Sequence, residues 1–338
     1  MNNILVVNVN WLGDVIFSTP IFKALKEAYP HARVSCLAVP RVKAILEHCP
    51  HIDEVIVYDE KGKHWYPWGK LQLIGSLRNK KFDVVFLLHR SMGRALMMFL
   101  TGIPKRVGYE TKKQSWFLTH KVQLSADNMH RADEYIKVVE DFGVKVEDRD
   151  SSLRVLDDEL RAVDAKLAQF GITSHDTLVV VNPGGNWDLK RWPSEYFSQL
   201  IMKLAKDFRV KILITGADKD VVLANKIAVQ SGVKPFVWAG ATSLQELLAL
   251  FKRADVVISN DTGPVHAAAS VGTDVIALFG PTRPEITGPR GRGRMVVLHK
   301  EIGCNKAPCY HLSCGQNECM RTITVDDVLQ AFQKIRHT

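Results

Sequence analysis

The sequence of 338 residues has no long hydrophobic run, since no stretch reaches the roughly 18 uninterrupted apolar residues that a membrane-spanning helix needs. The chain starts directly with a strand pattern, Asn3–Asn10. It therefore lacks the basic segment and the longer apolar run that begin a signal peptide. These two absences predict a cytoplasmic protein without a signal peptide. Hydrophobic residues make up 46% of the chain and charged residues 24%, a composition typical of soluble globular proteins.

Two common nucleotide-binding motifs are missing as well. No G-x-G-x-x-G motif follows a predicted strand, and no acidic residue stands about 20 positions beyond such a motif to hold a ribose. Both absences disfavour an NAD-linked enzyme. The P-loop spacing G-x-x-x-x-G-K-[ST] is also absent. A phosphate site in this chain must therefore be built differently.

Cysteine is scarce, and most of it lies in one short stretch. The chain has 6 cysteines, and Cys304, Cys309, Cys314 and Cys319 recur every fifth residue. Four thiols this close are candidates for zinc or an iron–sulfur cluster. Structural zinc sites, however, generally contain a C-x2-C pair, and a cytoplasmic location disfavours stable disulfides. We expect a reduced, partly exposed loop without zinc, with a metal site as the alternative.

The net charge of +9 is unevenly distributed along the chain. Residues 1–145 contain 21 Lys and Arg against 14 Asp and Glu, so this part alone carries +7. A basic first half favours an anionic partner such as an acidic glycolipid, a membrane surface or nucleic acid. The alternative is a set of scattered, solvated lysines.

The chain is long enough for two domains of about 150 residues, and its apolar patterns alternate between strand and helix. Such alternation is typical of parallel βαβ units. The predicted strands are Ile4–Val9, Arg33–Ala38, Glu54–Tyr58, Val84–Leu88, Leu178–Asn182, Val210–Thr215, Phe236–Trp238, Val256–Ser259 and Asp274–Phe279. The predicted helices are Ser18–Ala28, Val42–His48, Trp68–Asn79, Asp157–Gln169, Ser194–Lys206, Asp218–Gln230, Ser243–Lys252, Pro264–Val271 and Thr324–Ile335.

The two domains are expected to join between Glu147 and Thr177, and we assign residues 1–160 to the first and 161–323 to the second. The final helix occupies 324–338, with Thr324 as its N-cap. Each half is predicted to be a doubly wound α/β unit with a cleft between the two. Ligands of open parallel sheets bind at the carboxyl ends of strands, so the loops after strands are the candidate sites.

The first such loop is "NVNWLGDVIFSTP", Asn8–Pro20. Gly13 permits a tight turn and a close approach of a ligand to the backbone. Asp14 follows at the start of a helix, where it is either a helix-capping residue or a general base for a bound hydroxyl. Spacing alone leaves both roles open.

The second loop is "NPGGNWDLKRWP", Asn182–Pro193. Gly184 and Gly185 free backbone N–H groups for an anion, and Lys190 and Arg191 add cationic donors. We interpret it as a phosphate-binding loop, and a flexible surface loop is the alternative.

The third loop begins the helix in "VVISNDTGPVHAAASVG", Val256–Gly272. A helix that starts near Pro264 offers unpaired N–H groups and the positive end of its dipole to an anion. Thr262 and Gly263 suit the cap, and His266 lies in the first turn, where it is either structural or a phosphate donor.

These motifs, in this order and over nearly the whole chain, resemble the ADP-heptose:lipopolysaccharide heptosyltransferases of glycosyltransferase family 9. The segments that carry the resemblance are Asn10-Trp11-Leu12-Gly13-Asp14, Ser18-Thr19-Pro20, Asn182-Pro183-Gly184-Gly185, Lys190-Arg191-Trp192-Pro193, Asn260–His266 and Phe279-Gly280-Pro281-Thr282. "NWLGD", "KRWP" and the late cysteine-rich stretch are most similar to the heptosyltransferase II branch.

The resemblance implies a GT-B fold, with two facing Rossmann-like domains that hold the acceptor and the sugar nucleotide, and a final helix that packs back on the first domain. It implies inverting, metal-independent transfer of L-glycero-D-manno-heptose to the inner core of lipopolysaccharide, with heptosyl-Kdo2-lipid A as acceptor. Asp14 then matches the general base, and Lys190 matches a phosphate-contacting catalytic lysine. The implied donor contacts are Gly13, Gly184, Gly185, Arg191, Asp218, Asp261, Thr262, Gly263, Pro264 and His266.

On the acceptor side we expect Trp11, Arg90 and Arg94, because an acidic glycolipid requires cationic partners. The same basic domain suits peripheral contact with the cytoplasmic face of the inner membrane, and nucleic acid is not expected as a partner. The alternatives are a GT-B glycosyltransferase with another nucleotide-sugar donor, heptosyltransferase I or III acceptor specificity, and a sugar-nucleotide-binding module without activity.

Overall fold

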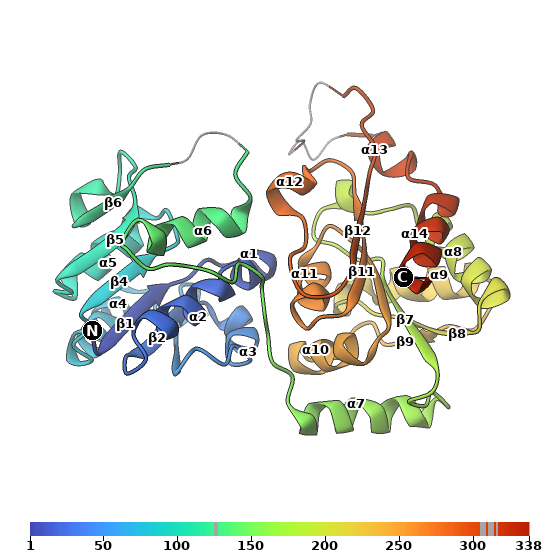
Figure 1. Ribbon diagram of the computed structural model, residues 1–338, viewed down its shortest axis with the longest axis horizontal. Helices are drawn as coiled ribbons and strands as arrows, with labels where there is room; N and C mark the ends of the chain where they lie inside the picture. Colours follow the sequence, from blue (N-terminus) through green and yellow to red (C-terminus); the bar gives the residue numbers. More distant parts are fainter. Residues whose placement is uncertain (125–127, 305–308, 310–313, 316, 338) are drawn as a thin grey trace. The chain divides into compact units, whose positions relative to one another are not determined.

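The computed structural model describes residues 1–124, 128–304, 309, 314–315 and 317–337. The chain divides into two compact units, Met1–Arg154 and Val155–Thr338 (Figure 1). Each unit contains one six-stranded sheet, and the strands that pair within it are parallel. The predicted α/β architecture of two doubly wound parallel sheets is therefore confirmed.

The first sheet has the strand order β3-β2-β1-β4-β5-β6. Its central strand β1 pairs with β2 and β4, so that Val7 lies opposite Leu37 on one side and Leu87 on the other. Runs of Val, Ile and Leu form these strands because both faces of a parallel sheet are buried. The strands are β1 (Asn3–Val7), β2 (Arg33–Ala38), β3 (Glu54–Val57), β4 (Val84–Leu87), β5 (Lys105–Tyr109) and β6 (His120–Val122).

The helices of the first unit form two groups. Helix α6 contacts α1 and α2, whereas α4 contacts α5, which in turn contacts the short 3-10 turn η2. The inner sides of α4 and α5 pack with β1 and β4 in one apolar cluster that includes Leu5, Leu77 and Met98. The elements are α1 (Leu12–Phe17), α2 (Thr19–Ala28), η1 (Pro40–Val42), α3 (Lys43–Leu46), α4 (Pro67–Asn79), α5 (Met92–Leu100), η2 (Ser115–Phe117) and α6 (Arg131–Glu140).

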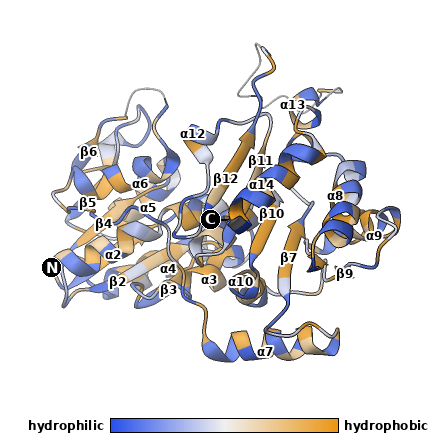
Figure 2. Cartoon of the chain, turned by 45° about the vertical axis from the view of Figure 1, so that its right-hand side comes forward, coloured by the Kyte–Doolittle hydropathy of each residue, from blue (hydrophilic) through white to orange (hydrophobic). Residues whose placement is uncertain are grey.

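The second sheet repeats this plan with the order β12-β11-β10-β7-β8-β9. Its strands are hydrophobic along most of their length in Figure 2, as expected for strands covered on both faces. The strands are β7 (Thr177–Asn182), β8 (Val210–Ile214), β9 (Phe236–Val237), β10 (Val256–Asn260), β11 (Asp274–Phe279) and β12 (Met295–His299).

Helices cover both faces of the second sheet. In Figure 1, α8, α9 and α14 lie on one side of the strands, and α10 and α11 lie on the other. Helix α10 begins at a capping box in which Ser243 Oγ accepts from Glu246 N at 3.2 Å and Ser243 N donates to Glu246 Oε2 at 2.8 Å. The elements are α7 (Asp157–Gln169), η3 (Asp188–Lys190), α8 (Ser194–Asp207), η4 (Asp218–Asp220), α9 (Val221–Gln230), α10 (Leu244–Arg253), α11 (Gly263–Ser270), α12 (Pro284–Thr287), α13 (Glu318–Arg321) and α14 (Val325–His337).

The final helix α14 packs on the second unit, where it contacts α8, β11 and β12. Val328, Phe332 and Ile335 are spaced four and three residues apart and form one buried stripe. They join the core cluster of the second unit, which provides the apolar partner that this stripe requires.

No helix in the part of the chain that the structure describes is both long and apolar enough to span a membrane.

Candidate functional site

Asp14 lies where the sequence places it, in the first turn of α1 after the carboxyl end of β1. Gly13 precedes it in the same helix and is half-buried. The N-cap residue Trp11 has an extended backbone and makes no side-chain cap hydrogen bond. The Asp14 carboxylate therefore stands near the positive end of a short helix.

Two residues of α6 that the sequence analysis missed contact this carboxylate. The Tyr135 hydroxyl donates to Asp14 Oδ1 at 2.9 Å, and Arg131 Nε lies 4.0 Å from the same oxygen. Burial, together with the negative charge of Asp14, raises the pKa of Tyr135 well above its ordinary value. Tyr135 thus remains protonated and holds Asp14 in one orientation.

Arg94, one of the predicted acceptor contacts, is buried and bound to neighbours in the first unit. Its side chain is only 4% exposed. The guanidinium donates to Asn8 O and Asn10 Oδ1, both at 2.8 Å, and to Glu60 Oε2 at 3.1 Å. Arg94 therefore holds the loop between β1 and α1 in place, because a buried guanidinium requires such partners.

The other two predicted acceptor residues remain accessible. Trp11 is exposed, and the guanidinium of Arg41 lies 4.5 Å from its ring centre. Arg90 forms an ion pair with Glu134 at 3.0 Å and lies over the ring of Tyr109. Both side chains are positioned by neighbours in the first unit.

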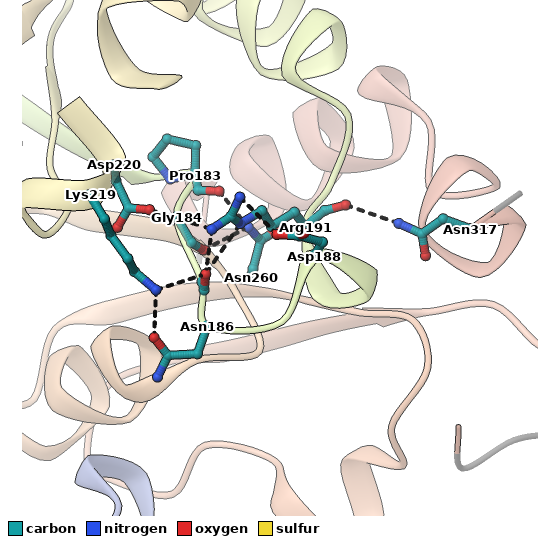
Figure 3. Close-up of polar contacts among 10 residues, drawn as sticks. Pro183, Gly184, Asn186, Asp188, Arg191, Lys219, Asp220, Asn260 and Asn317 are labelled. Carbon is teal, nitrogen blue, oxygen red and sulfur yellow. Dashed lines mark hydrogen bonds and ion pairs between the residues drawn. The ribbon is translucent and has the colours of Figure 1, made fainter. Parts of the chain in front are cut away.

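In the second unit, one asparagine that was not predicted joins the second and third loops. The Asn260 amide, at the end of β10, donates to the carbonyls of Pro183 at 2.9 Å and Gly184 at 3.1 Å (Figure 3). Its oxygen accepts from the backbone N–H of Trp192 at 3.0 Å. A buried amide with three satisfied hydrogen bonds fixes the two ends of the loop relative to α11.

Cationic side chains converge on the carbonyl oxygen of Gly185. Arg191 Nη2 donates to it at 2.7 Å and Lys219 Nζ at 3.3 Å, while Lys219 also donates to Asn186 Oδ1 at 2.6 Å (Figure 3). These contacts hold the glycine loop in a defined shape. The interpretation as a flexible surface loop is therefore disfavoured.

Close packing explains why glycine occupies two positions of this loop. A Cβ atom on Gly184 would lie 2.4 Å from Asp220 Oδ2, and one on Gly185 would lie 3.1 Å from Thr262 Cγ2. Asp220 is buried, accepts from Ala217 N at 3.1 Å and lies 3.7 Å from Arg191. The loop thus lies directly against the end of η4 and the cap of α11.

The buried carboxylate after β8 is Asp220, whereas the predicted donor contact was Asp218. Asp218 is exposed at the beginning of η4. Asp220 accepts from Ala217 N three residues earlier, but alanine at the N-cap lacks the side-chain acceptor of a capping box, so the sequence carries no signal for Asp220.

Lys190 and Asp261 meet in an ion pair at the entrance to α11, in which Asp261 is buried and Lys190 is half-buried. Lys190 Nζ lies 2.6 Å from Asp261 Oδ2, and the Thr282 hydroxyl donates to the same oxygen at 2.5 Å. His266 Nε2 is 3.8 Å from Asp261 Oδ1, and Asp261 is 3% exposed. The structure therefore brings together Lys190, Asp261 and His266, and it adds Thr282.

The start of α11 has the predicted local structure. Thr262 is the N-cap with an extended backbone, Gly263 is the first helical residue and Pro264 follows it. The N-cap makes no side-chain hydrogen bond to the first turn. Because the first N–H groups of a helix have no partner within the helix, this end suits an anion.

The cysteine-rich stretch lies partly outside the described residues, which omit 305–308, 310–313 and 316. Cys304 and Cys314 are exposed, Cys309 is buried and Cys319 is half-buried. Burial raises the pKa of the Cys319 thiol. Across the described ranges no group of three or more His, Cys, Asp or Glu side chains has the arrangement of a metal site.

The arrangement in the second unit has the chemistry of a phosphate site. Ammonium and guanidinium groups, a helix N-terminus and a glycine loop lie within one set of contacts. The first unit contributes a carboxylate oriented by a tyrosine. The two units thus contain an anion-binding group and a candidate base.

Comparisons with known proteins agree with this chemistry. The sequence profile of the family described as Glycosyltransferase family 9 (heptosyltransferase) matches residues 70–317. Lipopolysaccharide heptosyltransferase 2 of Escherichia coli K12 is 26% identical over 92% of this chain and 93% of its own length.

Two solved structures are similar over nearly the whole chain. The glycosyl transferase family 9 protein of Veillonella parvula has a TM-score of 0.88 and 28% identity, with 99% of this chain and 97% of that chain covered. The ADP-heptose lps heptosyltransferase II of Escherichia coli has a TM-score of 0.80 and 23% identity, with 99% and 98% covered. The second likeness shows the shared GT-B fold.

Proposed function

The chain belongs to glycosyltransferase family 9, and from this membership we propose that it transfers L-glycero-D-manno-heptose from ADP-heptose to the lipopolysaccharide inner core, with heptosyl-Kdo2-lipid A as acceptor. The relative named lipopolysaccharide heptosyltransferase 2 supports the acceptor class. The similar Escherichia coli structure, an ADP-heptose enzyme by its name, supports the donor.

The observation that carries the donor part is the cluster of Lys190, Arg191 and the start of α11 around the glycine loop. When ADP leaves, negative charge builds on the β-phosphate. Fixed donors aimed at that charge stabilise the transition state, and each contributes about 3 kcal/mol in comparable sites. An ammonium group has three donors, so Lys190 can keep Asp261 and still donate to a phosphate oxygen.

Asp14 is the general base in this proposal. Its carboxylate takes the proton of the acceptor hydroxyl as that oxygen attacks the anomeric carbon. The new carbon–oxygen bond forms on the face opposite the departing diphosphate, so the configuration inverts. The hydrogen bond from Tyr135 supports this role because it fixes the orientation of the carboxylate.

We further propose that transfer needs no metal ion, because Lys190, Arg191 and the N–H groups of α11 supply positive charge where the diphosphate leaves. A chelator such as EDTA should then leave the rate unchanged. Activity that is lost with EDTA and restored by Mg²⁺ or Zn²⁺ would contradict this part of the proposal.

The decisive experiment measures ADP release from ADP-heptose with heptosyl-Kdo2-lipid A as acceptor. Asp14→Asn should lower kcat by roughly 10²–10⁴-fold, the usual contribution of general base catalysis, with little change in the KM for ADP-heptose. Tyr135→Phe removes only the orienting hydroxyl and should have a smaller effect.

Three results would argue against the proposal. Full activity of Asp14→Asn would remove Asp14 as the base. A product that retains the anomeric configuration of the donor would exclude direct displacement. Faster turnover with Kdo2-lipid A than with heptosyl-Kdo2-lipid A would assign a different acceptor. Faster turnover with another nucleotide sugar than with ADP-heptose would assign a different donor.

A further inference from the structure

Large apolar side chains are exposed around the start of α4 and on the outer surfaces of α5 and η2 in the first unit. The inner sides of α4 and α5 are accounted for, because residues such as Leu73, Leu77 and Met97 lie in the core cluster. The outer sides face water and would ordinarily be polar. They therefore need a separate explanation.

Helix α5 presents an uncharged stripe to solvent. Met92, Leu96, Phe99 and Leu100 are all exposed, and their spacing of four, three and one residues places them on one side of the helix. The one charged residue of α5, Arg94, is buried. A solvent-facing helix side without a charge is rare in a soluble domain.

Aromatic side chains extend this stripe. Trp68 at the start of α4 is 77% exposed, and Trp116 in η2 is 87% exposed. Trp65, Tyr66 and Leu71 are exposed as well. With the four residues of α5, these side chains make up nine of the eighteen large apolar side chains that are exposed among the described residues. Single exposed apolar residues are common, but such a concentration indicates an interaction surface.

The elements that carry these side chains are joined to one another. Helices α4 and α5 each follow a strand of the same parallel sheet and contact each other, and Arg78 Nη2 at the end of α4 donates to Leu100 O at 2.8 Å. The ring centres of Phe99 and Phe117 are 5.8 Å apart, which joins η2 to α5. We name this surface the aromatic face, defined by Trp65, Tyr66, Trp68, Leu71, Met92, Leu96, Phe99, Leu100 and Trp116.

Positive charge surrounds the aromatic face. Residues 61–122, which contain it, include 13 Lys and Arg but only the two acidic residues Asp83 and Glu110. Lys61, Lys63 and Lys70 are exposed near the start of α4, and Lys112 and Lys113 are exposed just before η2. This one segment carries a charge of +11, more than the whole chain.

We infer that the aromatic face docks on an anionic lipid bilayer. Trp and Tyr are enriched at membrane–water interfaces, where the ring inserts among the headgroups. Interfacial binding grows with the apolar area that is buried and with the attraction of Lys and Arg to anionic lipid. A protein partner fits less well, because the cores of protein interfaces are depleted in lysine.

This inference deepens the proposed function, because the biological reason for membrane docking rests on that function. An acceptor that is anchored in a bilayer is reached most efficiently by an enzyme held at the same bilayer. The docking chemistry itself, however, depends only on the aromatic face and its lysines.

The test is sedimentation of the full chain with vesicles of pure phosphatidylcholine and with vesicles in which about a third of the lipid is phosphatidylglycerol. The protein should sediment with the anionic vesicles and much less with the neutral ones, and added salt should weaken the binding. Equal binding to both vesicles, or binding to neither, would overturn the inference.

Two variants locate the contact. Trp68→Ala/Trp116→Ala should weaken binding to anionic vesicles at least about tenfold, because the exposed rings supply apolar area at the interface. Lys112→Glu/Lys113→Glu should weaken it by roughly 25-fold or more, since one basic residue near the surface contributes about fivefold. All four side chains are exposed, so thermal unfolding should change little.

Matched controls lie in the second unit. Val222→Ala/Val229→Ala removes two apolar side chains that are each 81% exposed on α9, and Lys206→Glu/Lys226→Glu reverses two exposed lysines. Both controls should bind vesicles like the wild type. If they weaken binding as much as the aromatic-face variants do, the inference is wrong.

Turnover separates this inference from the proposed function. The aromatic-face variants should lose rate with acceptor embedded in vesicles and keep the wild-type rate with a delipidated, water-soluble acceptor. Wild-type protein that binds vesicles but transfers no heptose would overturn the proposed function alone. Sedimentation velocity that shows dimers of the wild type, absent in Trp68→Ala/Trp116→Ala, would instead assign the face to a second copy of this chain.

Discussion

At the scale of single residues, the ion pair of Lys190 and Asp261 has a structural role in addition to the donor-binding role that we propose. Asp261 is only 3% exposed, and a buried carboxylate requires cations and donors around it, which Lys190 and Thr282 provide. The lysine that the resemblance assigns to the phosphate is therefore also the counter-ion of a buried aspartate.

We predict that Lys190→Met destabilises the protein as well as slowing transfer. Loss of one partner of a buried ion pair costs about 3–5 kcal/mol, because the remaining charge is left uncompensated. Chemical denaturation with intrinsic fluorescence measures this loss. Lys219→Met, which removes an exposed lysine of η4 that contacts the same loop, is the matched control and should change stability by less than about 0.5 kcal/mol.

The double variant Lys190→Met/Asp261→Asn completes a thermodynamic cycle. It should recover a large part of the lost stability, because the buried charge is gone. Recovery of stability without recovery of transfer would show that the lysine has its own role with the donor. A double variant less stable than Lys190→Met would contradict the proposed origin of the loss.

At the scale of secondary-structure elements, prediction succeeded where apolar periodicity was strong. Asp157–Gln169, Arg33–Ala38 and Asp274–Phe279 have the predicted bounds. The strands β5, β6 and β12 and the helices α5 and α6 were not predicted. Strand β5 begins with Lys105-Arg106 and so lacks the continuous apolar run of a central strand, whereas β12 does contain an apolar run, Met295–Leu298, and was missed.

The final helix shows why packing partners are harder to predict than helices. Its sequence predicts one apolar stripe but does not specify which surface accepts it. In the structure the core of the second unit accepts this stripe, and the sequence of the helix does not name these partners.

We predict that Phe332→Ala in α14 destabilises the second unit by about 3–5 kcal/mol, the usual cost of removing a fully buried phenylalanine. Differential scanning calorimetry should show this as a lower unfolding temperature for the unit that contains α14, with the transition of the first unit unchanged. Gln330→Ala, on the exposed side of the same helix, is the control and should have little effect.

At the scale of the whole molecule, the two units divide the chemistry between them. The first contains the candidate base Asp14 and the basic, aromatic surface. The second contains the candidate diphosphate site. The excess positive charge lies in the unit that, in our proposal, meets the acidic acceptor.

We predict that ADP stabilises the protein against heat and that NAD does not. A ligand present at 100 times its Kd adds about 2.7 kcal/mol to the stability of the state that binds it. For a unit of this size, that corresponds to roughly 5–10 °C in unfolding temperature, measured by dye-based thermal shift. Arg191→Ala should reduce the ADP effect, and an equal shift with NAD would favour a different nucleotide enzyme.

The sequence by itself determined the alternation of strands and helices, the two-domain plan and the three loops at strand ends, because these follow from apolar periodicity and from glycine and proline positions within short segments. It also carried the motifs that identify the family. Only the tertiary structure decided which polar groups meet. Tyr135 reaches Asp14 across 121 residues, Asn260 holds a loop 76 residues away, and Arg94 turns inward to Asn8. Such pairings depend on how separate elements pack, and the spacing within any one segment does not specify that packing.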